Sequence, residues 1–138
     1  MIEFADTVYL AFYLYLVMVL IQWGVASISK ANQPNSVPGK ISSDLSHESF
    51  VFRSHRTFQN TLENSLLFVG TVLFAFILNY QGALFAIAVW VYLVARILHM
   101  ILYYGIATEK NPSPRSYFFL IGLAANVFML ILIGIRII

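Results

Sequence analysis

Long apolar segments alternate with short polar ones along the chain. Four segments are mostly apolar, namely residues 7–29, 49–79, 83–107 and 117–138. A helix needs about 20 such residues to cross a bilayer, and all four segments are long enough. The pattern therefore predicts an all-α membrane protein, a single domain built as a four-transmembrane-helix bundle.

Polar connections with helix-breaking residues separate these segments. Lys30–His47 contains Pro34, Pro38 and Gly39, and Ser49 is placed to cap the next helix. Asn79–Gly82 is a short uncharged turn. Thr108–Ser116 contains Asn111-Pro112-Ser113-Pro114, which should prevent helix formation before Arg115.

The composition supports a membrane location. The chain has 138 residues, of which 60% are hydrophobic and 10% charged, so it is too apolar for an ordinary soluble domain. The net charge of +2 is small and spread among the loops, which gives no reason to expect nucleic-acid binding. There is no cysteine, so any thiol chemistry needs a thiol from a substrate or cofactor.

The charged residues predict an orientation. Six basic residues lie in or beside the first and third connections: Lys30, Lys40, Arg53, Arg56, Lys110 and Arg115. Both loops are therefore expected to face the cytoplasm, with both chain ends outside. Glu3 and Asp6 near the start favour a retained first helix over a cleaved signal peptide. The short loops and the lack of a retention tail favour a bacterial inner membrane.

One stretch of the second helix is unusually polar. Residues 53–64 carry charges and amides, yet they continue without a break into the apolar residues 65–78. Arg53, Arg56, Asn60 and Glu63 recur at steps of three and four, so they share one helix face. This stripe is roughly 15 Å long and carries ionised groups below the membrane surface. Charge at that depth indicates a functional site.

The third helix carries a second stripe of the same kind. Arg96, His99 and Tyr103 share a face, and Arg115 and Ser116 follow the third connection. The combined set contains several cations and one carboxylate, which favours an anionic ligand that carries a carboxylate. Arginine suits this task because its planar fork donates two parallel hydrogen bonds. Glu63 is expected either to bind an ammonium group of the ligand or to pair with an arginine.

These motifs resemble the MAPEG family, the membrane-associated proteins of eicosanoid and glutathione metabolism. The resemblance runs from about Val51 to the end of the chain. It rests on three motifs in order: Arg56-x-x-x-Asn60-x-x-Glu63-Asn64, Ala95-Arg96-x-x-His99-x-x-x-Tyr103 and Arg115-Ser116. It implies a homotrimer of four-helix subunits that binds glutathione in a cleft between neighbouring subunits, near the cytoplasmic side.

The resemblance also implies roles for individual residues. Asn60, Glu63, Arg96, His99 and Tyr103 would hold glutathione, and we add Arg53 and Arg56 from the same stripe. Arg115 would lie beside the sulfur, with Ser116 as a possible hydrogen-bond donor, and both would favour the reactive thiolate. A hydrophobic second substrate would arrive from the bilayer.

The chain departs from the family pattern at three places. Phe52 replaces an acidic residue found in many members, Gln59 replaces a basic residue or histidine, and only Lys30 remains of a basic cluster. These differences argue against assignment to one eicosanoid enzyme.

Simpler interpretations exist for several of these residues. Arg53 and Arg56 are also suited to anchoring at the headgroups, and Glu63 to pairing with Arg56 or Arg96. Asn60 and Asn64 would also serve as interhelical hydrogen-bonding groups, which is the preferred interpretation for Asn64. His47 and His55 lie outside both stripes and are not expected in the site. Three scattered histidines predict no metal site.

Three functional hypotheses follow. The first is a membrane-bound glutathione transferase or peroxidase that acts on hydrophobic electrophiles or lipid hydroperoxides. The second is a non-catalytic scaffold of the same fold that binds lipid or glutathione. The third is a small transporter or structural membrane protein, which gives the Arg115-Ser116 pair no obvious role.

Overall fold

The computed structural model describes residues 4–138 and consists of four helices. These are α1 (Phe4–Ala31), α2 (Phe50–Ile77), α3 (Ala83–Gly105) and α4 (Pro114–Ile137). The described residues contain no strand. All four helices are long and apolar enough to cross a membrane. The predicted all-α, four-helix membrane fold is confirmed, while Glu3 lies outside the described residues.

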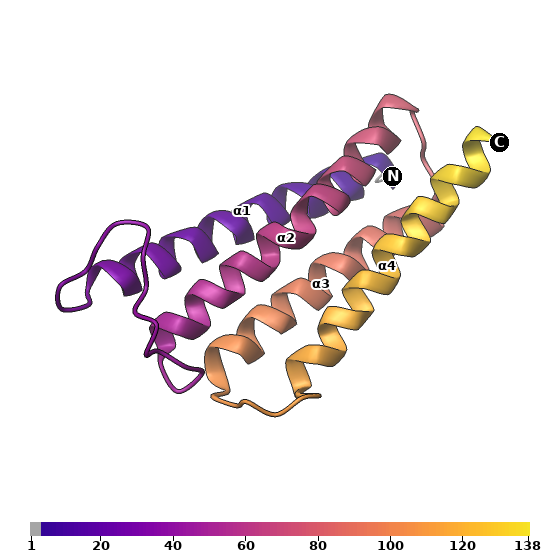
Figure 1. Cartoon of the computed structure of the whole chain (residues 1–138). Coiled ribbons are helices and arrows are strands. Elements are labelled where there is room, and N and C mark those ends of the chain that lie inside the picture. Colours follow the sequence, from indigo (N-terminus) through magenta and orange to yellow (C-terminus); the bar gives the residue numbers. More distant parts are fainter. Residues whose placement is uncertain (1–3) are drawn as a thin grey trace.

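The helices pack antiparallel to their chain neighbours (Figure 1). The α1–α2 and α3–α4 connections lie at one end of the bundle, and both termini lie at the other end with the short α2–α3 turn. Within residues 4–138, α2 and α3 contact each other and both outer helices, whereas α1 and α4 do not touch. The two connections expected to carry the basic residues therefore meet at one end.

Two helix boundaries differ from the expected ones in ways that affect the charged end. Helix α1 continues to Ala31, so Lys30 belongs to its last turn and not to the loop. Helix α4 begins at Pro114, three residues before the expected Tyr117. Proline is tolerated at the first helical position, where its missing N–H would have no helical partner. Ser113 and Ser116 form a capping box there, so Arg115 stands in the first turn of α4.

The α2–α3 turn follows directly from its residues. Asn79 takes the left-handed conformation with φ of 50°, which asparagine tolerates better than most residues. The Tyr80 N–H donates to the Ala75 carbonyl at 2.9 Å and the Asn79 N–H donates to the Phe76 carbonyl at 3.0 Å. This pair of bonds is a Schellman motif, which closes α2 and turns the chain toward α3.

Aromatic rings fill the centre of the bundle where α1, α2 and α3 meet. Phe68 and Tyr92 stack with centroids 4.0 Å apart, and Tyr15 meets Phe68 edge-on at 4.6 Å. The Tyr15 hydroxyl is hydrogen-bonded to Ser65 at 2.6 Å. Many large apolar side chains are instead exposed on the outside of the bundle, as expected for a surface that faces lipid.

Candidate functional site

The buried centre of the polar region is Arg96. Its side chain is only 1% exposed, and Nη2 donates to Asn60 Oδ1 at 2.8 Å and to Thr61 Oγ1 at 3.0 Å. Gly122 on α4 lies against the arginine stem, where an added Cβ would be 3.6 Å from Cδ. Arg96 therefore links α2, α3 and α4. It stands nine residues before the end of α3, which is roughly 13 Å along the helix.

The rest of the α3 stripe leads from Arg96 to the end of the bundle. His99 and Tyr103 are both buried, with their ring centroids 5.5 Å apart. The Arg115 guanidinium lies over the Tyr103 ring, 4.3 Å from its centroid, which is a favourable cation–π geometry. Arg115 Nη2 also donates to the Thr108 carbonyl at 3.2 Å. The structure thus brings Arg96, His99, Tyr103 and Arg115 into one row, and helical spacing had predicted this for the first three.

His47, which we did not expect in the site, covers the outer end of this row. Its Nε2 is 3.0 Å from the Tyr103 hydroxyl, and its Nδ1 is 2.8 Å from Glu109 Oε1. The His47 N–H also donates to the same carboxylate at 3.1 Å. These bonds hold the Glu109 pKa below its usual value, and the charge of Arg115 adds to the effect. His47 therefore ties the first loop to the third loop, above Tyr103.

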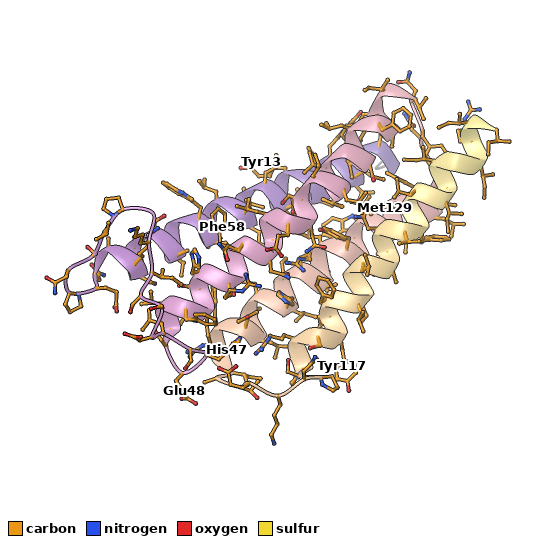
Figure 2. The ribbon with its side chains drawn as sticks, in the orientation of Figure 1. Tyr13, His47, Glu48, Phe58, Tyr117 and Met129 are labelled. Carbon is orange, nitrogen blue, oxygen red and sulfur yellow. The ribbon has the colours of Figure 1, made fainter. Side chains whose placement is uncertain are left out.

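Figure 2 shows His47, from the first connection, and Tyr117, from the first turn of α4, at the same end of the bundle. No periodic pattern in the sequence includes His47, because it lies in a loop 56 residues from Tyr103. The signal that could have predicted this contact was chemical. A buried tyrosine hydroxyl such as that of Tyr103 needs a hydrogen-bond partner, and His47 lies just before the start of α2.

Arg53 fixes the start of α2 to the end of α3. Its Nη1 donates to the carbonyls of His47 at 2.7 Å and Glu48 at 2.9 Å, and its Nε donates to the Tyr104 carbonyl at 3.3 Å. The guanidinium also lies 5.6 Å from the centroid of the Phe50 ring. A cation at the last turn of a helix is favourable because the carbonyls there carry partial negative charge. In this structure Arg53 serves to hold the first loop in place.

The polar face of α2 is divided between two directions. Asn60 points to Arg96, whereas Arg56 and Glu63 lie toward the outside, with side chains 40% and 61% exposed. Arg56 Nη1 donates to Gln59 at 2.9 Å and is 4.0 Å from the Glu63 carboxylate. We expected Glu63 to converge with Arg96 and Arg115, but within one subunit it stands apart. At about 100° per residue, a step of seven leaves residues 56 and 63 roughly 20° apart on one flank of the stripe, about 40–60° from Asn60.

Within residues 4–138 the two cations of the row have no acidic partner. Neither Arg96 nor Arg115 forms an ion pair with a carboxylate there, and Arg96 Nε and Arg115 Nη1 are buried without a hydrogen-bond partner. Buried charge normally requires a counter-charge and full hydrogen bonding. The row from Arg96 to Arg115 is therefore suited to an anionic ligand.

Comparison with known proteins agrees with this chemistry. The model of the MAPEG family matches residues 7–135. The chain belongs to the MAPEG family. Neither the curated proteins nor the solved structures contain a match. Membership fits a role in glutathione-related or eicosanoid metabolism.

Two residues of the MAPEG-like motifs make bonds other than those expected. Asn64 donates to the Asn60 carbonyl of its own helix at 2.7 Å, and not to a neighbouring helix as we preferred. The Ser116 hydroxyl accepts the Ser113 N–H at 3.2 Å and lies 3.2 Å from the Ser113 hydroxyl. Ser116 thus caps α4. Its expected donation to a ligand sulfur stays a prediction in this MAPEG chain.

Proposed function

We propose that this MAPEG protein is a membrane-bound glutathione transferase or peroxidase that acts on hydrophobic electrophiles or lipid hydroperoxides. The observation that carries the proposal is Arg115, whose guanidinium is seated on Tyr103 with Nη1 buried and unbonded. A fixed cation with a free donor stabilises a thiolate relative to a thiol. The chain has no cysteine, so the thiol comes from glutathione.

The remaining residues of the row suit the rest of glutathione. Arg96 and Asn60 offer a buried cation and an amide for a carboxylate, and His99 and Tyr103 lie between them and Arg115. The attacking thiolate forms a bond to the carbon of the electrophile, and the leaving group departs with the electron pair of the broken bond. With a hydroperoxide, the thiolate attacks the terminal oxygen, the O–O bond breaks, and the alkoxide leaves and takes up a proton to give the alcohol. The resulting sulfenic acid of glutathione then reacts with a second glutathione, which gives the disulfide and water.

Steady-state conjugation tests this proposal. Purified protein should accelerate the reaction of glutathione with a chloronitrobenzene acceptor, and Arg115→Ala should lose most of the rate. Arg136→Ala is the matched control, because it removes an arginine from the opposite end of the same helix. Rates equal to the uncatalysed reaction over a broad panel of electrophiles would contradict the enzyme assignment.

We further propose that the subunit assembles as a homotrimer. The support is the outward position of Arg56 and Glu63, two ionised groups on a helix that crosses the membrane. A neighbouring subunit would cover them and bring Glu63 to a shared site. The mass of the protein in mild detergent tests this: three chains are expected, and a stable monomer that binds glutathione would contradict it.

We also propose that the first and third loops face the cytoplasm of a bacterial inner membrane. The six basic residues in or beside these connections support this orientation. Because the chain has no cysteine, Ser43→Cys provides a single reporter in the first loop. Labelling of that cysteine by a membrane-impermeant reagent only after cell lysis is expected. Labelling in intact cells would mean that the first loop faces outward and would contradict the proposed orientation.

One observation favours the scaffold as a second candidate. The Ser116 hydroxyl is engaged in the α4 capping box, which leaves Arg115 as the main support for a thiolate. A protein that binds glutathione or lipid in the same place without turnover would also give Arg96 and Arg115 their missing hydrogen-bond partners. Tight glutathione binding without conjugation activity would identify this case.

A further inference from the structure

The first loop folds back on the end of α1 and encloses a cavity. Asn35 and Gly39 take left-handed conformations, with φ of 56° and 79°, which turn the chain sharply. The Lys40 N–H donates to the Val37 carbonyl at 3.1 Å, and the Ser36 hydroxyl donates to the Ala31 carbonyl at 3.3 Å. The result is a cavity of about 260 Å³ between this loop, the end of α1 and the start of α2.

The charged groups of this first-loop cavity are all of one sign. Lys30 and Lys40 both line it, and no carboxylate does. Within residues 4–138 neither lysine pairs with an acidic side chain. An anion bound in this small cavity would be attracted by both lysines.

The C-terminal end of α1 repels an anion less strongly than a helix end whose carbonyls have no hydrogen-bond donors. The carbonyls of its last turn accept hydrogen bonds: Ile28 from the Asn32 N–H, Lys30 from the Gln33 N–H and Ala31 from the Ser36 hydroxyl. Because these oxygens are already bonded, their partial negative charge is reduced at the cavity.

The lining of the cavity is partly apolar. Val37, Ile41, Leu45 and Val51 line it together with the two lysines, and the uncharged polar residues of the lining are Gln33, Asn35, Ser36 and Ser42. The cavity lies where α1 leaves its membrane span, at the end of the bundle that holds both long connections (Figure 1). A phosphate with attached glycerol and acyl carbons matches this mixture of cations and apolar walls better than a free anion does.

We propose that the first-loop cavity binds the headgroup of an anionic phospholipid, with its phosphate between Lys30 and Lys40. This inference does not depend on the proposed enzymatic function, because the cavity shares no lining residue with the Arg96–Arg115 row. Basic groups at a membrane surface attract anionic lipid, and the expected contribution is about fivefold in affinity for each lysine.

Native mass spectrometry of the detergent-solubilised protein tests the site. Phosphatidylglycerol should remain bound in preference to phosphatidylcholine, and Lys30→Gln or Lys40→Gln should each lower its affinity about fivefold. Lys110→Gln is the matched control, because it removes one exposed lysine from the third loop, outside the cavity. Lys30→Arg with Lys40→Arg should retain binding, which keeps the test valid if a glutamine variant does not fold.

Two results would overturn the proposal. If Lys110→Gln weakens phosphatidylglycerol binding as much as Lys30→Gln does, the attraction is a general effect of surface charge. If water-soluble glycerol phosphate competes at the same concentration as the lipid, the cavity recognises free phosphate and the apolar wall contributes nothing.

Discussion

Arg96 on α3 donates a hydrogen bond of 2.8 Å from Nη2 to the side-chain oxygen of Asn60 on α2. This bond joins the two central helices through the buried side chain of Arg96. It also leaves the arginine Nε without a partner in the described chain. The same contact therefore stabilises the bundle and orients a cation for a ligand.

Asn60→Leu should destabilise the protein by about 1–3 kcal/mol, because it leaves a buried arginine with only its bond to Thr61. Thermal unfolding in detergent measures this loss. Asn64→Leu is the control, since the Asn64 amide bonds only to a carbonyl of its own helix. Equal destabilisation by the two variants would mean that the bond between Arg96 and Asn60 adds nothing specific.

Substitutions of Tyr103 should separate its ring from its hydroxyl. Tyr103→Phe keeps the ring beneath Arg115 and removes only the bond to His47. Tyr103→Leu removes both. A cation–π contact is worth about 0.5–2 kcal/mol, so the leucine variant should raise the glutathione concentration for half-maximal rate by about 2- to 30-fold more than the phenylalanine variant. If the two variants raise that concentration equally, the hydroxyl and not the ring positions the ligand.

The contact between His47 and Glu109 should loosen in acid. Hydrogen bonds from His47 lower the Glu109 pKa, with Arg115 assisting, and Arg53 holds the His47 carbonyl. A carboxylate with a lowered pKa stabilises the folded state above its unfolded pKa, and this stabilisation is lost as the pH falls through the folded value. The protection of residues 40–49 against hydrogen exchange, relative to the intrinsic rate at each pH, should therefore fall at pH values below the usual pKa range of a glutamate.

Glu109→Gln tests the assignment of that acid effect. The variant should show faster exchange in the first loop at neutral pH and little further change in acid. Glu48→Gln is the control, because the Glu48 side chain makes no bond in the described chain whereas its carbonyl accepts from Arg53. If Glu109→Gln retains the full acid response, another group controls the loop.

The sequence predicted the fold well because membrane helices leave a strong signal. Segments of more than about 20 apolar residues separated by proline and glycine have few alternatives to a helical bundle. Helix α4 begins earlier than the predicted Tyr117 because proline at the first helical position is compatible with a helix. The Ser113–Ser116 capping box extends the helix to include Arg115.

Helical periods predicted which candidate residues lie together on one helix. The spacing of Arg96, His99 and Tyr103 places them on one face, and the structure has them buried together. Helical spacing does not say which flank of a broad stripe faces a neighbour, so Glu63 was expected in the centre and lies on the outside. His47 was missed because a loop has no period from which a contact with Tyr103 could be inferred.

Rapid mixing of the purified protein with glutathione, followed by the ultraviolet absorbance of the thiolate, tests the central claim most directly. Lowering the thiol pKa by about two units, worth roughly 2.7 kcal/mol, would convert most bound glutathione to thiolate at neutral pH. The wild-type protein and Arg136→Ala should show this absorbance, and Arg115→Ala should not. Tight glutathione binding by the wild-type protein without any thiolate absorbance would contradict the account.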